Sequence, residues 1–365
     1  MLGIYIHIPF CKAKCGYCDF NSFPPEGEDV KAYKNALIKE INESPYKGEK
    51  CRTVFIGGGT PSFIPPVYIG EILTAVFSCF PPEKDCEVTM EANPDSLSPE
   101  GLRAYLSYGV NRLSMGVQSF NNEHLKLLGR IHSAERAEAA FYEAREAGFK
   151  NINIDLMFFY PGQSIESWVK DLEKAVILNP EHISAYSLII EENTKFFNLY
   201  KNYQTNEDEY RIMYRKAKKI LGDAGYERYE ISNFAKEGFL CRHNAAYWKR
   251  TDYLGFGLSA HSLYGKRRFW NGDDFKAYLK GEKAVGEEVL TQRDEISEFM
   301  FLGLRMSNGV LNSEFQGLFG LSLNQMFGDV IKKYENMGLL RFDGERLRLT
   351  DEGIDVSDTI FADFV

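Results

Sequence analysis

The feature that most constrains the fold is a repeated alternation of short apolar segments and longer amphipathic ones. Predicted strands begin near residues 4, 53, 86, 112, 151 and 182, and most are separated by a clear helical pattern, as in Asp29 to Glu43 and Pro66 to Cys79. Strand–loop–helix units of this kind pair in parallel through right-handed crossovers, so the sequence predicts an α/β fold. Six units fall short of the eight that close a barrel.

Three cysteines follow the first predicted strand directly. Cys11, Cys15 and Cys18 form a CxxxCxxC array in one loop. Three thiolates can hold an iron–sulfur cluster, but a cluster of four irons needs four ligands, so one iron stays open to another molecule. Three other interpretations remain: buried structural thiols, a disulfide, and a zinc site completed by His7.

Composition narrows the class of protein. The chain has 365 residues, 44% of them hydrophobic, and a net charge of -9, which argues against nucleic acid as the main partner. No apolar run approaches the roughly 20 residues that cross a bilayer, and Met1 leads straight into a predicted strand. We therefore expect a soluble cytoplasmic protein that is not an integral membrane protein.

The flanks of the cysteine array resemble a known family. Tyr5 stands six residues before Cys11, HIPFC leads into the array, and the aromatic Tyr17 precedes Cys18. This pattern is similar to that of the radical S-adenosylmethionine (SAM) enzymes, in the branch of the HemN and HemW proteins. The resemblance implies a 4Fe-4S cluster on the three cysteines, SAM on the open iron, and a partial, open (β/α)6 barrel.

Polar residues stand where the predicted strands end, which is where parallel barrels place their chemistry. In this family the matching positions contact SAM. Glycine lets backbone approach a ligand, carboxylates accept from its amino or hydroxyl groups, and Arg130 can pair with its carboxylate. Taken singly, GGGTPS is a weak turn signal, Arg130 a surface charge and Asp155 a helix cap. The SAM residues implied by the resemblance are Tyr5, Tyr17, Gly58, Gly59, Thr60, Glu91, Gln118, Arg130, Asp155 and His261.

A second motif, HNxxYW, comprises His243, Asn244, Tyr247 and Trp248. It resembles the heme chaperones of the family, where the motif histidine is proposed to ligate heme iron. The alternative for His243 is an ordinary hydrogen bond within a turn. Phe20 stands where the oxidases of the family have a further cysteine, which also favours the chaperones.

The predicted function is therefore a heme chaperone that binds a 4Fe-4S cluster, SAM and heme and delivers heme to respiratory cytochromes. Its expected partners are heme or porphyrin and recipient heme proteins at the cytoplasmic face of the membrane. The first alternative is an oxygen-independent coproporphyrinogen III oxidase, which decarboxylates its substrate by radical chemistry. The second is an iron–sulfur transcription regulator.

The predicted domains are a barrel with the cluster and SAM site over 1–200, an extension over 201–290 and a smaller domain over 291–365. One charged helix is expected between Leu199 and Gly225. The last part reads as helices, a hairpin turning at Asp343-Gly344 and a final helix, similar to a winged helix. Such folds often bind DNA, and Arg341, Arg346 and Arg348 suit phosphate. In this family the domain covers the barrel mouth, so we expect a lid.

Overall fold

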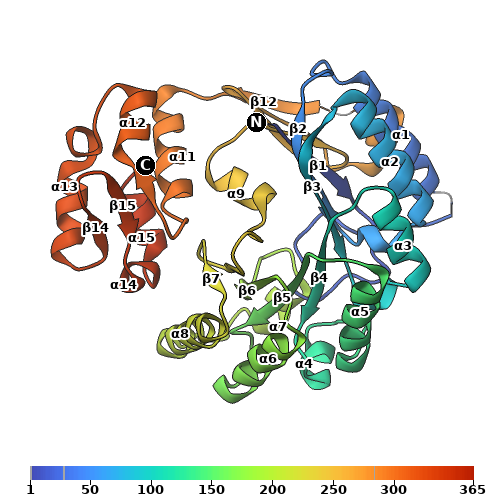
Figure 1. Ribbon diagram of the computed structural model, residues 1–365, viewed down its shortest axis with the longest axis horizontal. Coiled ribbons are helices and arrows are strands. Elements are labelled where there is room, and N and C mark those ends of the chain that lie inside the picture. The colour runs from blue at the N-terminus through green and yellow to red at the C-terminus, as the bar shows by residue number, and fades with distance from the viewer. Residues whose placement is uncertain (1, 28, 283) are drawn as a thin grey trace.

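The computed structural model describes residues 2–27, 29–282 and 284–365 and contains a curved sheet with helices on its outer face (Figure 1). The strands are Leu2–Ile8 (β1), Cys51–Gly58 (β2), Pro82–Ala92 (β3), Arg112–Gln118 (β4), Ile152–Phe158 (β5), His182–Ser187 (β6), Glu227–Arg228 (β7), Asn233–Ala235 (β8), Tyr253–Phe256 (β9), His261–Tyr264 (β10), Arg267–Asn271 (β11), Ala284–Val289 (β12), Val310–Leu311 (β13), Leu340–Phe342 (β14) and Arg346–Leu349 (β15).

The helices alternate with the strands in the first half of the chain and dominate its end. They are Asp29–Glu43 (α1), Pro66–Cys79 (α2), Pro99–Ser107 (α3), Asn122–Leu127 (α4), Ala134–Ala147 (α5), Ile165–Leu178 (α6), Lys195–Tyr200 (α7), Glu207–Asp223 (α8), Arg242–Trp248 (α9), Phe275–Lys280 (α10), Gln292–Gly303 (α11), Asn312–Phe319 (α12), Leu323–Asn336 (α13), Asp351–Ile354 (α14) and Ser357–Ala362 (α15).

Strands β1 to β6 lie side by side in chain order and are all parallel. Beyond β1 the sheet continues through β9, which is parallel to it, and the antiparallel β10, β11 and β12. Beyond β6 it continues through β8 and β7. In the part of the chain that the structure describes, the edge strands β12 and β7 do not pair with each other. The predicted α/β fold with a partial, open barrel is confirmed.

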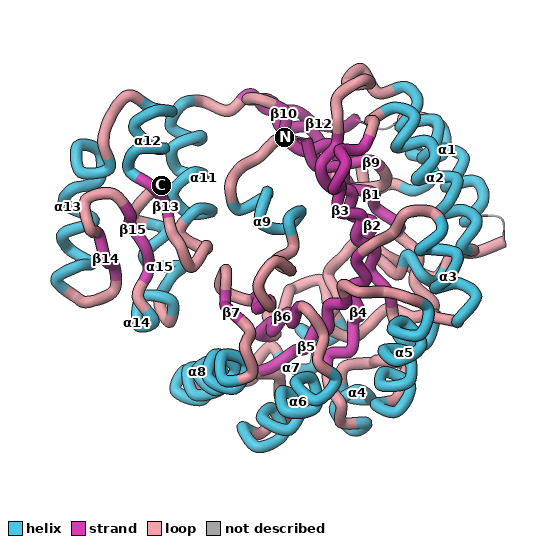
Figure 2. The backbone as a smooth tube through the Cα atoms, in the orientation of Figure 1, coloured by secondary structure: helices cyan, strands magenta, loops and turns pink. Residues whose placement is uncertain are grey.

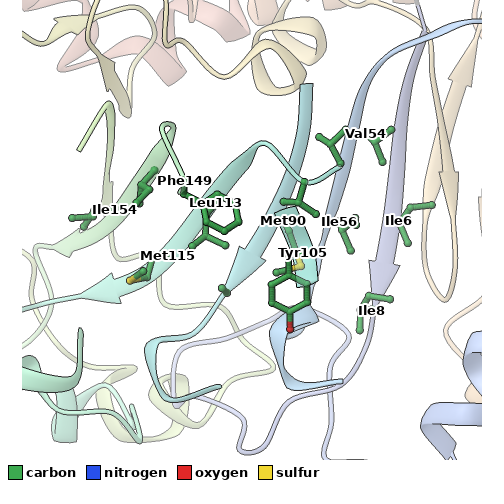
Figure 3. Close-up of a cluster of buried hydrophobic side chains, with 14 of the residues drawn as sticks. Ile6, Ile8, Val54, Ile56, Met90, Tyr105, Leu113, Met115, Phe149 and Ile154 are labelled. Carbon is green, nitrogen blue, oxygen red and sulfur yellow. The ribbon is translucent and has the colours of Figure 1, made fainter. Parts of the chain in front are cut away.

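The two faces of the sheet differ in chemistry because side chains alternate along each strand. On one face, Ile6, Val54, Met90, Leu113 and Ile154 are fully buried (Figure 3). They belong to the main core, which also contains buried residues of α1, α2, α3, α5 and α6. The residues between them in sequence face the concave side and are often polar. The alternation therefore places an apolar core outside the sheet and a polar surface inside it.

The charged segment after β6 differs from the prediction of one helix between Leu199 and Gly225. It forms two helices, α7 and α8, separated by a turn. The break has a local cause, because the side chain of Asn206 accepts hydrogen bonds from the backbone N–H groups of Asp208 and Glu209. An asparagine in this position caps a new helix instead of continuing an old one.

The C-terminal unit has a hydrophobic core of its own. Met300, Phe315, Leu347 and Ile360 are buried in it, and helices α11 to α13 lie beside the three-stranded sheet β13–β15–β14 (Figure 2). The hairpin β14–β15 confirms the predicted turn, whereas the final helix is divided into α14 and α15. The guanidinium of Arg346 donates to the carbonyl of Asn308.

Ion pairs join this unit to the barrel. Glu298 of α11 accepts from Arg250 at 2.8 Å and from Arg268 at 2.6 Å, and its side chain is only 10% exposed. Arg305 lies 3.6 Å from the buried carboxylate of Glu230. Because Arg250 comes two residues after α9, this contact also fixes the end of that helix. Glu298 thus joins the C-terminal unit both to the segment after α9 and to strand β11.

We expect Glu298→Ala to lower the free energy of unfolding by about 2 kcal/mol, because Arg250 and Arg268 lose their shared partner and each keeps one other carboxylate. Urea unfolding measures the loss, and limited proteolysis between residues 272 and 300 reports loosening of the C-terminal unit. The matched control is Glu287→Ala, whose pair with Arg267 is exposed and contributes under about 1 kcal/mol. Equal effects of the two variants would contradict this role.

Candidate cofactor site

A cavity of about 480 Å³ opens on the concave side of β1 to β6. Its lining combines the cysteine loop after β1, inward-facing residues of the six parallel strands and residues of α9. A volume of this order suits an organic cofactor. The predicted site residues that line it are Tyr5, Cys11, Cys15, Tyr17, Cys18, Gly58, Gly59, Thr60, Glu91, Gln118, Arg130, Asp155 and His243.

The loop after β2 fixes the start of the cysteine loop. The N–H of Gly59 donates to the carbonyl of Ile8 at 2.7 Å, and that of Thr60 donates to Phe10 at 2.8 Å. A Cβ atom on Gly59 would lie 2.7 Å from the Phe10 carbonyl oxygen, so only glycine permits this approach. The Gly-Gly-Thr segment therefore has a structural role that the weak turn signal alone did not reveal.

Two side chains contact the cysteine sulfurs. The Thr60 hydroxyl lies 3.4 Å from Cys11 Sγ, and Arg130 Nη1 lies 3.3 Å from Cys15 Sγ. Arg130 Nη2 also donates to Asn93 at 2.6 Å and to the Gly116 carbonyl at 2.7 Å. The guanidinium is thus not a solvated surface charge, because it joins β3, β4 and the cysteine loop.

The donor set fits a cluster better than a single ion. Among the described residues, no three His, Cys, Asp or Glu side chains are grouped closely enough to hold one metal ion. His7 cannot complete a zinc site as it stands, because its Nδ1 is bonded to the Tyr5 hydroxyl and its Nε2 to the Asn21 carbonyl. In a cluster each cysteine binds a different iron, so the sulfurs stand farther apart. All three cysteines are free thiols facing one cavity.

Glu91 and Asp155 bring two half-buried carboxyl groups to the cavity. Burial, with the nearby charge of Asp155, raises the pKa of Glu91 to about 8, although its Oε2 accepts from the N–H of Gly58 at 3.1 Å. Burial also raises the pKa of Asp155, which accepts from Asn153 at 2.7 Å. Glu91 is therefore mostly protonated at neutral pH, and a cationic ligand would favour its ionised form.

His243 lies deep in the cavity on α9 and is 3% exposed. Its Nδ1 is 2.8 Å from Thr53 Oγ1 and its Nε2 is 3.1 Å from the Tyr247 hydroxyl. Burial and the charge of Arg112 lower the pKa of His243 to about 3, so the imidazole is neutral at physiological pH. Both ring nitrogens are therefore hydrogen-bonded in this structure, and a metal ion at Nε2 would have to replace the Tyr247 hydroxyl.

His261 is not among the residues that line the main cavity. It stacks on Trp270 with ring centroids 5.6 Å apart and lines a smaller neighbouring cavity. The two cavities share Tyr5, Phe20 and Tyr247. No described residue after Tyr247 lines the main cavity, and the role of the C-terminal unit as a lid stays a prediction. The C-terminal unit packs against α8, α9 and the end of the sheet, through contacts such as Lys218 with Asp351.

The sequence interpretation missed several polar residues on the inner face of β4, β5 and β6. Asn153 donates to Ser114 at 2.8 Å, and its Oδ1 lies 2.6 Å from His182 Nδ1. The signal that could have found them is the alternation of polar and apolar residues within strands that should be apolar throughout in a parallel sheet covered on both faces. The missed lining residues are Arg112, Ser114, Asn153, His182, Ser184 and Tyr186.

Comparisons with known proteins agree on one family. The model of the radical SAM superfamily matches residues 5–175, and that of the HemN C-terminal domain matches residues 290–356. The heme chaperone HemW of Lactococcus lactis subsp. lactis is 38% identical over 99% of this chain and 96% of its own length. The heme chaperone HemW of Bacillus subtilis is 37% identical over 100% of this chain and 99% of its own length.

Among solved structures, coproporphyrinogen III oxidase (HemN) from Escherichia coli, a radical SAM enzyme, superposes with a TM-score of 0.86 at 25% identity. The match covers 100% of this chain and 89% of that one. Within the described part of the chain, no helix has the length and apolar character needed to span a membrane.

The pKa of Glu91 gives a prediction for the metal-free protein. Since the folded pKa is about 8 and the unfolded value about 4.5, the proton on Glu91 stabilises the fold at low pH. That stabilisation is lost as pH rises from about 4.5 to about 8, by a few kcal/mol at about 1.4 kcal/mol per pKa unit. Urea unfolding across this range should show the fall in wild type but not in Glu91→Gln. Exposed Glu100→Gln is the control, and equal pH profiles for wild type and Glu91→Gln would refute the assignment.

Proposed function

Because the chain belongs to the HemW family of radical SAM proteins, we propose that it is a heme chaperone that binds a 4Fe-4S cluster, SAM and heme. The observation that carries this proposal is the similarity to heme chaperones along essentially the whole chain. The family resemblance inferred from the cysteine array and its flanks is confirmed, and membership itself implies the cluster and SAM.

The cluster and SAM roles in this proposal come from the family resemblance, and positions in the cavity support most of them. Cys11, Cys15 and Cys18 hold the cluster, with Thr60 and Arg130 as hydrogen-bond donors to two of the sulfurs. Cluster and SAM together supply one-electron chemistry when bound. The carboxyl groups of Glu91 and Asp155 accept from polar groups of SAM in this proposal, and Gly58 lines the cavity with them. The remaining SAM residues that we propose are Tyr5, Tyr17, Gly59, Gln118 and Arg130 in the cavity, and His261 in the neighbouring one.

Heme binds in this proposal with His243 as an axial ligand. Neutral imidazole is the form that ligates iron, and the low pKa of His243 keeps it neutral. The Thr53 hydroxyl accepts from Nδ1–H and orients the ring, which leaves Nε2 for the metal. The Tyr247 hydroxyl competes for the same Nε2 lone pair, so heme enters only as Tyr247 turns away.

The proposed recipients are respiratory cytochromes, loaded by a cytoplasmic chaperone at the membrane face. A chaperone must release its cargo, and a ligand that Tyr247 can displace from His243 suits reversible binding. The second candidate function is that of an oxidase, and Phe20 argues against it. This residue is 66% exposed and lines the cavity at the position where the oxidases have a cysteine. The observation that favours the oxidase is the structural similarity to HemN.

We expect Tyr247→Phe to bind hemin several-fold more tightly than wild type, because it removes the hydroxyl that occupies His243 Nε2. His243→Ala should bind at least about tenfold more weakly and lose the spectrum of an imidazole-ligated heme, since a lost ligand is worth more than 1.4 kcal/mol. Hemin titration of anaerobically reconstituted protein, followed by visible spectra, measures both. Tyr226→Phe is the matched control, because its buried hydroxyl donates to Pro180 outside the cavity. Unchanged hemin binding in both variants would exclude His243 as the ligand.

The oxidase candidate has a separate test. Reconstituted protein incubated anaerobically with SAM, a reductant and coproporphyrinogen III should yield no decarboxylated porphyrin. Chromatography of the oxidised pigments detects the product. Its accumulation over many turnovers would make the chain an oxidase despite Phe20 and would overturn the chaperone proposal.

A further inference from the structure

One charged side chain in the cavity has no assigned role. Arg112 begins β4, is 2% exposed and lines the cavity. Its Nε atom has no hydrogen-bond partner among the described residues. An arginine stays charged at any physiological pH, so this is a buried cation with an unsatisfied Nε–H donor. Such a group is costly unless a ligand completes it.

The acids near Arg112 are engaged elsewhere. The charges of Glu87 and Asp155 act on it. However, Glu87 accepts from the N–H groups of Arg242 at 3.0 Å and His243 at 3.1 Å. Asp155 accepts from Asn153. The described part of the protein thus leaves the Nε–H of Arg112 without a partner, and a carboxylate is the group that a guanidinium fits best.

The position of Arg112 identifies which ligand can reach it. Along β4, Arg112 lies four residues from Gly116, which is about 13 Å at 3.3 Å per residue. The carbonyl of Gly116 accepts from Arg130, which lies beside Cys15. The backbone of Arg112 is therefore far from the cysteine loop, although its charge also acts on Glu91 and Asp155. His243 lies at the same deep end, because Arg112 pairs with Thr89 of β3 and its charge acts on the His243 ring.

We propose that Arg112 binds a ligand carboxylate at the deep end of the cavity, and that its source is a propionate of the tetrapyrrole held beside His243. This inference rests on the proposed function. It adds a second anchor for the tetrapyrrole, because His243 binds the metal at the ring centre and Arg112 a carboxylate at the ring edge. Two anchors on one face of a cavity fix the orientation as well as the position of a flat ligand.

The test compares hemin with hemin dimethyl ester, in which both propionates are blocked, on the full-length reconstituted protein. Wild type should bind hemin about tenfold more tightly than the ester, because a charge-assisted bond is lost in the ester. Arg112→Met should bind both forms with similar affinity, whereas Arg112→Lys should retain part of the preference. Arg103→Met, on the exposed face of α3, controls for net charge and should behave as wild type.

The outcomes separate this inference from the proposed function. Wild type that binds no hemin contradicts the proposed function itself. Wild type that binds hemin and ester equally, or an ester preference unchanged in Arg112→Met, overturns the role of Arg112. A parallel titration with SAM and decarboxylated SAM tests the other carboxylate. If Arg112→Met weakens SAM alone, the carboxylate belongs to SAM and the assignment to a propionate is wrong. Thermal unfolding of Arg112→Met and Arg112→Lys checks that each variant keeps its fold.

Discussion

The site depends on two backbone hydrogen bonds between neighbouring loops. Gly59 and Thr60, after β2, donate to the carbonyls of Ile8 and Phe10, which lead from β1 into the cysteines. These bonds fix the first cysteine relative to the sheet, and the Thr60 side chain reaches its sulfur from the same turn. A loop that must present three thiolates in one geometry cannot be flexible at its base. The position of the cysteine loop, and with it the shape of the cavity, therefore depends on the close backbone contact at Gly59.

Much of the fold could be predicted because it depends on local periodicity. The parallel strands and the helices between them show in the sequence as short apolar runs and as spacing of 3.6 residues, and β1 to β6 occur where these patterns predict. The strands β9 to β12 were missed. They are short, rich in charge and glycine, and they form because β1 offers an open edge, which no local pattern records.

The candidate site divides in the same way. Motif residues such as Cys11 and Glu91 were recognised from spacing and family resemblance. His261 was placed with them by its motif, but stacking on Trp270 directs it to a neighbouring cavity. Arg112 and His182 carried no motif, and their importance comes from the register that sets them on the inner face. The register between strands far apart in sequence depends on tertiary packing. A single sequence indicates it only through the alternation of polar and apolar residues within each strand.

Helix α9 is attached at its two ends to different cores. At its start, the N–H groups of Arg242 and His243 are held by Glu87 of β3. Past its end, Arg250 is held by Glu298 of the C-terminal unit, and Arg305 of that unit lies over the Trp248 ring at 4.3 Å. The helix therefore connects the two cores. A rotation of the C-terminal unit would have to break these end contacts or tilt the helix that carries His243.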